Sequence, residues 1–158
     1  MRKLEVYVDT SVFGGTNDDE FREESMRFFD LARQGRYLLL VSRITVDELE
    51  GAPSAVRDFV RGLPPNCLQQ VPVTEEVEVL AQDYLDAGAL GEKSRADALH
   101  VAAATVARAD LILSWNFKHI VNYDRIRRFN GINVLKGYNQ IEIRSPLEIG
   151  YGDEDQEV

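Results

Sequence analysis

Residues 95–104 read RADALHVAAA, and this stretch decides how the rest of the chain must be arranged. After Asp97, its residues are small or apolar almost all the way round a helix. A helix that is apolar on every side is buried, so we expect this one to pack closely on a sheet. The predicted helix runs from Ser94 to Ala107, and its first turn, which carries Asp97, lies near the rim of that sheet.

Short β-rich runs alternate with helical segments along the chain. The predicted strands are Leu4–Val8, Tyr37–Val41, Leu68–Val73, Leu111–Ser114 and Gly131–Leu135. The other predicted helices are Arg22–Ala32, Ser42–Glu50 with Ser42 as its cap, Pro53–Arg61, Glu75–Ala87 and Ile120–Arg128. Gly14 and Gly15 are expected to break the chain after the first strand. The short alternation favours an α/β fold with a parallel sheet and right-handed crossovers.

Composition excludes several classes of protein. The 158 residues are 44% apolar and 28% charged, the balance of a folded domain. The single cysteine, Cys67, excludes an internal disulfide and a multi-cysteine zinc site, and two histidines argue against a histidine-rich metal site. No apolar run approaches the roughly 20 residues of a membrane span, and the start of the chain lacks the apolar stretch of a signal peptide. We therefore expect a cytoplasmic protein that does not enter a membrane.

We expect one domain over residues 1–150, with a C-terminal extension from about residue 136 and a disordered acidic tail at 151–158. The apolar residues of Ile141–Ile149 suit an edge strand, an arm that faces a partner, or packing on the same domain. The net charge of −9 argues against binding nucleic acid, because such proteins are usually basic. Basic residues nevertheless gather at Lys93 and Arg95 and along Lys118–Arg128, which leaves that question open.

Four polar residues follow predicted strands or lie in the helices after them, at one end of the sheet: Asp9, Glu48, Asp97 and Asn116. Each has an ordinary structural explanation. Asp9 and Asn116 suit turns, Glu48 suits a solvated helix face, and Asp97 matches a capping pattern with Ser94. In parallel sheets, however, the working site lies beyond the carboxyl ends of the strands, which is where all four are expected.

Carboxylates gathered in one place repel one another unless a cation lies among them. Two of them about 4 Å apart interact by roughly 4 kcal/mol at an intermediate dielectric constant. A divalent ion such as Mg²⁺ or Mn²⁺ removes this repulsion and prefers oxygen ligands. The sequence therefore predicts a metal site at this edge of the sheet.

Four segments together resemble the PIN domain: YVDTSV around Asp9, TVDEL around Glu48, RADALHVAAA from Arg95, and SWNFKHI around Asn116. The resemblance extends over about residues 3–135 and is strongest to the toxin ribonucleases of VapBC-type toxin–antitoxin pairs and their stand-alone relatives. It implies a three-layer α/β/α sandwich with a five-stranded parallel sheet. It also implies an endoribonuclease that depends on Mg²⁺ or Mn²⁺.

The resemblance assigns a role to each of the four residues. Asp9, Glu48 and Asp97 become the metal-binding acids, and Glu48 either holds a metal-bound water or acts as the base. Asn116 stands where many members of the family carry a fourth aspartate. Its amide lacks the negative charge, so a second metal ion should bind weakly or not at all, and activity should be low, altered or absent.

Further residues near these segments are expected to contact RNA: Ser11, Arg95, Lys118 and His119. Members of the toxin group usually form homodimers and bind an antitoxin protein, so the resemblance implies both partners here. The alternative is a PIN-fold module that binds an antitoxin-like protein or RNA without cleaving it. The net negative charge and the amide of Asn116 favour that alternative.

Overall fold

The computed structural model describes residues 2–149, so the predicted acidic tail at 151–158 lies outside the described residues. The strands are β1 (Leu4–Val8), β2 (Tyr37–Val41), β3 (Leu68–Gln70), β4 (Leu111–Leu113) and β5 (Glu142–Arg144). The α-helices are α1 (Thr10–Gly15), α2 (Arg22–Arg33), α3 (Arg43–Glu50), α4 (Ser54–Arg61), α5 (Glu75–Asp86), α6 (Arg95–Val106) and α7 (Tyr123–Leu135). Among residues 2–149, no helix combines the length and apolar character needed to cross a membrane.

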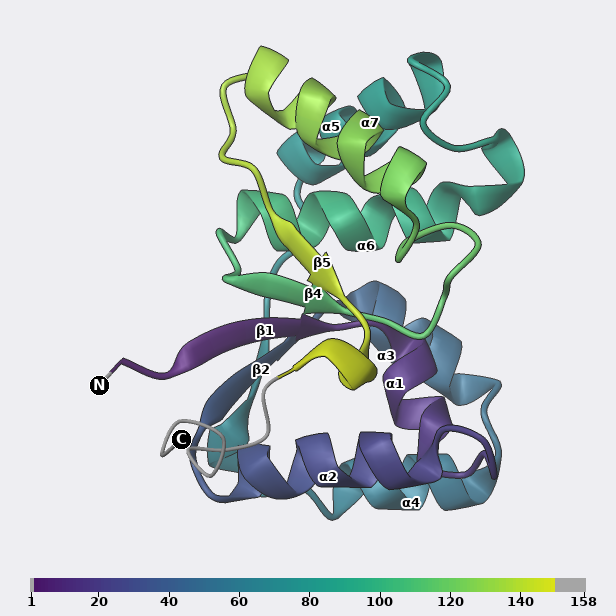
Figure 1. Cartoon of the computed structure of the whole chain (residues 1–158), viewed down its shortest axis with the longest axis vertical. Coiled ribbons are helices and arrows are strands. Elements are labelled where there is room, and N and C mark those ends of the chain that lie inside the picture. Colours follow the sequence, from purple (N-terminus) through teal and green to yellow (C-terminus); the bar gives the residue numbers. More distant parts are fainter. Residues whose placement is uncertain (1, 150–158) are drawn as a thin grey trace.

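The five strands form one parallel sheet in the order β3-β2-β1-β4-β5. The first strand of the chain is therefore the central one, and its Val6 lies between Leu39 of β2 and Leu111 of β4. Helices α5, α6 and α7 cover one face of the sheet, while α1, α2 and α4 lie on the other (Figure 1). The predicted α/β/α sandwich with a five-stranded parallel sheet is confirmed.

Alternating residues of the strands divide the apolar core between the two faces. Tyr7, Leu40 and Ile112 belong to the core beneath α5, α6 and α7. Their neighbours Val8 and Leu113 belong to the core beneath α1, α2 and α4. This alternation follows from the pleat of a strand, which sends successive side chains to opposite faces.

The predicted fifth strand, Gly131–Leu135, is wrong, because these residues form the last turns of α7. The β-branched residues of this stretch favoured a strand, but the buried side chains Phe129 and Asn133 are spaced for one face of a helix. The fifth strand lies instead at Glu142–Arg144, within the C-terminal extension. Two of the possibilities for that extension are therefore observed together, because it supplies the edge strand and its Ile141 and Ile143 are buried in the core of the same domain.

Gly14 and Gly15 do not break the chain as predicted, because both lie in helix α1. The reason is the packing of Gly15. The indole Nε1 of Trp115 donates a hydrogen bond of 2.8 Å to Ser25 Oγ directly against this glycine. The missing side chain lets α1, α2 and the segment after β4 approach one another.

Gly15→Ala should lower the free energy of unfolding by about 1–3 kcal/mol, the usual cost of overfilling a packed core. The added methyl group would collide with Ser25 Oγ and lie 2.8 Å from Trp115 Nε1. Gly14→Ala is the matched control, since its methyl group meets nothing within 4 Å. The control should gain up to about 1 kcal/mol from the better helix propensity of alanine. Urea unfolding measures both variants, and equal stabilities would contradict this account of the packing.

Candidate functional site

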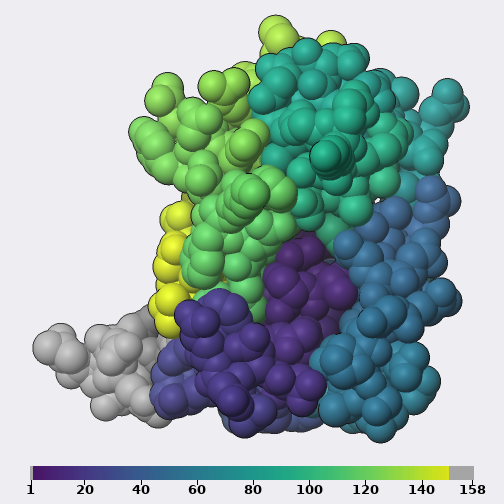
Figure 2. Space-filling model, turned by 90° about the vertical axis from the view of Figure 1, so that its right-hand side faces the viewer, coloured from purple at the N-terminus to yellow at the C-terminus, as the bar shows by residue number. Residues whose placement is uncertain are grey.

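Asp9 lies at the carboxyl end of the central strand and is 5% exposed. Its backbone N–H donates to Leu113 O (2.9 Å), which joins the ends of β1 and β4. Its side-chain Oδ2 accepts hydrogen bonds from Ser11 Oγ (2.7 Å) and Ser114 Oγ (2.8 Å). The strands run from left to right in Figure 1, so their carboxyl ends lie on the right-hand side of that view. Figure 2 shows the molecule from that side, and the purple N-terminal segment lies there between blue and green segments.

Glu48 comes from helix α3, which begins after β2 with a cap on Ser42. The Ser42 hydroxyl accepts from the Ile44 N–H, and Thr45 completes a capping box. This start turns Glu48 toward the neighbouring α1, where its Oε1 accepts from Thr10 Oγ1 at 2.7 Å. The Glu48 side chain is 38% exposed. It therefore stands at the mouth of the cluster rather than on a fully solvated helix face.

His100 belongs to this group of side chains, and the sequence did not predict it. It lies on α6, is fully buried, and places Nε2 2.5 Å from Glu48 Oε1 and 3.6 Å from Asp9 Oδ1. A signal existed, because residues three apart on a helix share a face and His100 follows Asp97 by three. The apolar residues around it pointed to the core instead.

Asp9, Glu48 and His100 form a group that could hold a metal ion. Each offers one ligand atom, and these atoms lie within 4.8 Å of one another. They come from three parts of the fold, since Asp9 directly follows β1, Glu48 lies in α3 and His100 lies in α6. The fold thus gathers side chains that are up to 91 residues apart in the sequence, the interval between 9 and 100.

The pKa values of His100 and Glu48 are shifted by their mutual interaction. Burial acts to lower the pKa of His100, but Tyr7 and the carboxylates of Glu48 and Asp9 outweigh it and raise the pKa to about 10. Burial acts to raise the pKa of Glu48, yet the hydrogen bond and charge of His100, helped by Thr10, lower it overall. An imidazolium between two carboxylates is the arrangement that these shifts describe.

Asp97 lies beside this group, in the first turn of α6. It does not pair with Ser94 in the predicted capping pattern, because the Ser94 side chain caps nothing in α6. Instead its Oδ2 lies 3.1 Å from Nδ1 of His119. Burial and then the charge of Asp9 raise the pKa of Asp97, against the opposing effects of both histidines. Asp9 and Asp97 are therefore close enough to repel each other.

Asn116 holds together the turn after β4. Its Oδ1 accepts from the backbone N–H of His119 (2.9 Å), and its own N–H donates to Ser114 Oγ (2.9 Å). These contacts are those of an ordinary turn residue, which is the structural explanation that the sequence offered for Asn116. The turn also brings His119 to Asp97, so Asn116 positions a side chain that reaches the acids.

The other predicted RNA contacts differ in their surroundings. The Ser11 hydroxyl donates a hydrogen bond to Asp9 and accepts one from the Trp115 N–H at 2.9 Å, so both of its hydrogen-bonding roles are filled within the protein. Arg95 is exposed and donates to Gln82 Oε1 at 2.8 Å. Lys118 is exposed in the turn beside Asn116. Two of the four, Ser11 and His119, are thus in direct contact with the acids.

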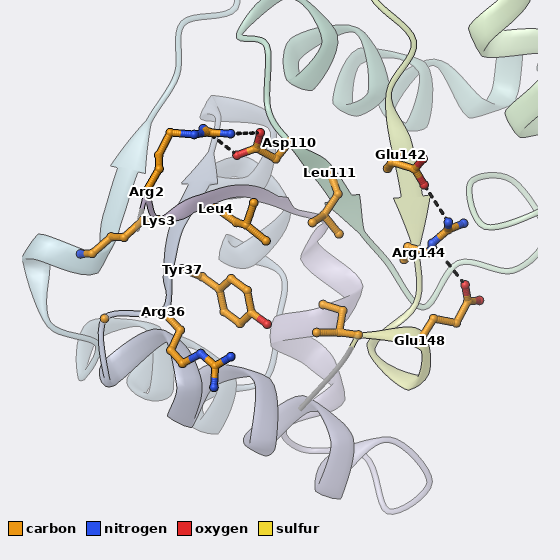
Figure 3. A pocket seen from close by; sticks show the side chains of 12 residues that line it. Arg2, Lys3, Leu4, Arg36, Tyr37, Asp110, Leu111, Glu142, Arg144 and Glu148 are labelled. Atoms are coloured by element: carbon orange, nitrogen blue, oxygen red, sulfur yellow. Dashed lines mark hydrogen bonds and ion pairs between the residues drawn. The ribbon is translucent and has the colours of Figure 1, made fainter. Parts of the chain in front are cut away.

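A pocket of about 660 Å³ lies at the opposite, amino-terminal edge of the sheet (Figure 3). Its charged walls pair among themselves, with Arg2 bonded to Asp110, and Arg144 to Glu142 and Glu148. Its apolar lining comes from the starts of strands. This pocket contains none of the predicted site residues.

Neither a protein-family model nor a curated protein sequence matches this chain. Solved structures do match. VapBC2 from Rickettsia felis, bound to a DNA fragment from its promoter, aligns over 90% of this chain and 98% of its own, with 12% identity and a TM-score of 0.57. FitAcB from Neisseria gonorrhoeae aligns over 91% and 99%, with 14% identity and a TM-score of 0.58.

VapC20 from Mycobacterium tuberculosis, a toxin that cleaves the sarcin–ricin loop, aligns over 87% of this chain and 98% of its own. Its identity is 16% and its TM-score 0.55. At such identities the likeness concerns the fold. The chain therefore has the VapC-like PIN fold that the sequence predicted.

Proposed function

We propose that this protein is an endoribonuclease that depends on Mg²⁺ or Mn²⁺. The observation that supports the proposal is the group of Asp9, Glu48 and His100 at the carboxyl edge of a PIN-fold sheet. Asp97 lies on the same helix as His100, near enough for the charge of Asp9 to raise its pKa. The neighbour VapC20 is a loop-cleaving toxin with the same fold, which supports this choice of reaction.

The side chains present fit a divalent ion. Asp9 and Asp97 are partly or fully withdrawn from water and repel each other, a cost that a bound cation removes. Both hydroxyls that contact Asp9 reach only its Oδ2, and Oδ1 lies 3.6 Å from His100 Nε2. Asp9, Glu48 and Asp97 would hold the ion. When bound, it supplies an acidified water and polarises the scissile phosphate.

The remaining chemistry falls to residues of the chain. Glu48, at the mouth of the cluster, can accept a proton from the attacking water. His119 is held beside Asp97 by the Asn116 turn, from which it can reach a phosphate of the RNA. Arg95 and Lys118 are exposed cations that can hold the RNA backbone. Ser11 fixes the rotamer of Asp9, and its predicted contact with RNA stays a prediction.

The proposal is tested by incubating the purified protein with mixed RNA substrates in Mg²⁺, Mn²⁺ or EDTA, beside an Asp97→Asn variant. Cleavage that requires the metal and is lost in the variant is the expected result. The same background cleavage by both proteins in all three conditions would reject the enzyme. It would favour the alternative, a PIN-fold module that binds without cutting.

Asn116→Asp should raise the affinity for Mn²⁺. The aspartate keeps an oxygen for the His119 N–H, so the turn should survive, and it adds a negative charge beside the cluster. Calorimetric titration with Mn²⁺ measures the change, and the unfolding temperature of the variant checks that the turn is intact. An unchanged affinity would show that position 116 does not contact the ion.

One observation favours the binding module as a second candidate. The Asn116 oxygen already accepts a backbone hydrogen bond, and no fourth acid replaces it at this position. The neighbours VapBC2 and FitAcB carry the names of two-component complexes, which supports an antitoxin-like protein as a partner of this chain. RNA as substrate belongs to the ribonuclease proposal, whereas a homodimer and a cytoplasmic location are proposed for both candidates.

A further inference from the structure

His100 presents one ring nitrogen to the carboxylates of the site. Its Nε2 lies 3.6 Å from Asp9 Oδ1 and 2.5 Å from Glu48 Oε1, and the imidazole has no exposed surface. The residue stands at the meeting point of β1, α3 and α6. No other nitrogen donor joins this group among residues 2–149.

We propose that His100 Nε2 is itself a ligand of the divalent ion, and that the site consequently prefers a first-row transition ion such as Mn²⁺ to Mg²⁺. The inference rests on the proposed function, since it concerns the same ion. It changes the donor set from the all-oxygen one that the sequence predicted to a mixed set of oxygen and nitrogen.

The distances suit shared coordination by Asp9 and His100. Two donor atoms about 2.1 Å from one ion are about 3.0 Å apart at a right angle and at most about 4.2 Å apart. The observed 3.6 Å between Asp9 Oδ1 and His100 Nε2 lies within that range. The 2.5 Å between Glu48 and His100 is shorter, so the half-exposed Glu48 carboxylate must turn aside or use its other oxygen.

The second ring nitrogen of His100 already has the hydrogen-bond partner that usually fixes the ring of a histidine ligand. His100 Nδ1 lies 2.7 Å from the Tyr7 hydroxyl, which lies 2.8 Å from Ser42 Oγ. All three side chains are buried. A ligating histidine usually donates its other N–H to an acceptor, which fixes the ring. The Tyr7 hydroxyl can accept from Nδ1 while it donates to Ser42. An ion that binds at Nε2 would displace the proton that this nitrogen shares with Glu48, and the proton would leave to solvent.

The nitrogen ligand is the basis of the metal preference. Mg²⁺ is usually held by a few carboxylates, phosphates and water and gains little from imidazole, whereas sites that include nitrogen ligands bind the transition ions in rising order from Mn²⁺. We expect Mn²⁺ to bind the wild-type protein at least about tenfold more tightly than Mg²⁺, and this ratio to shrink when His100 is replaced.

The decisive measurement uses the fact that the chain has two histidines, His100 and His119. In a His119→Gln protein without an affinity tag, labelling with ¹⁵N-histidine marks His100 alone. Pulsed electron paramagnetic resonance of bound Mn²⁺ then detects ¹⁵N coupling if His100 is a ligand. Because His100 remains in place, the test does not depend on a variant of the buried core.

Calorimetric titrations with Mn²⁺ and with Mg²⁺ supply the second readout, on wild type, His119→Gln and His100→Gln. Histidine coupling together with a preference for Mn²⁺ supports the inference. Mn²⁺ binding without that coupling, or equal affinities for the two ions in wild type, overturns it and leaves the ribonuclease proposal standing. Failure of every divalent ion to bind overturns both.

Discussion

Replacing Asp9 by asparagine is expected to reduce metal-dependent RNA cleavage by about 100-fold or more. The amide keeps the size of the side chain and can still accept from Ser11 and Ser114, so the local fold should persist. What it loses is the buried negative charge of the group whose ligand atoms lie within 4.8 Å of one another. A ligand charge that contributes about 3 kcal/mol to the transition state corresponds to roughly a hundredfold in rate.

The measurement is the initial rate of RNA cleavage as a function of Mn²⁺ concentration. Asp110→Asn is the matched control, because Asp110 lies at the opposite edge of the sheet and bonds Arg2. The control should cleave RNA at the wild-type rate. Wild-type activity in Asp9→Asn, or an equal loss in both variants, would be incompatible with a metal site at the carboxyl edge.

Phe29→Ala should cost about 3–5 kcal/mol of folding free energy, the range for deleting a large buried side chain. Phe29 is fully buried on α2, and its ring stacks on Phe13 and meets Phe28 and Phe59 edge-on. These contacts join α1, α2 and α4 beneath the sheet. A loss of this size is a large part of the total stability of a typical domain, about 5–15 kcal/mol.

Urea unfolding measures this loss, with the same dependence of the unfolding free energy on urea concentration used for wild type and variant. Leu135→Ala serves as the comparison, because Leu135 is 79% exposed near the end of α7 and should change stability by no more than about 0.5 kcal/mol. Similar losses in the two variants would mean that the aromatic cluster does not anchor this layer.

The sequence predicted the architecture because its strongest patterns are local. Leu4–Val8 is a β-rich run and Tyr37–Val41 an apolar one, both of strand length, and both strands have these bounds in the structure. The edge strand could not be identified in the same way. Gly131–Leu135 is rich in β-branched residues, and only its packing inside α7, where Asn133 accepts from Tyr84, shows that it is helical.

The candidate site was predictable in part. Asp9 could be placed from its position after β1, and Glu48 from the helix that follows β2. The pairing of His100 with both acids depends on how α6 crosses the sheet, which no local pattern encodes. The same holds for Asp97, whose partner His119 comes from a turn 22 residues further along the chain.

The central position of β1 has a consequence for synthesis of the chain. Val6 and Val8 are synthesised more than a hundred residues before their neighbours in β4. Ser114, which holds Asp9, arrives at the same late stage. Contacts so distant along the sequence form slowly. A nascent chain therefore carries Asp9 without its partner Ser114 while more than a hundred further residues are added.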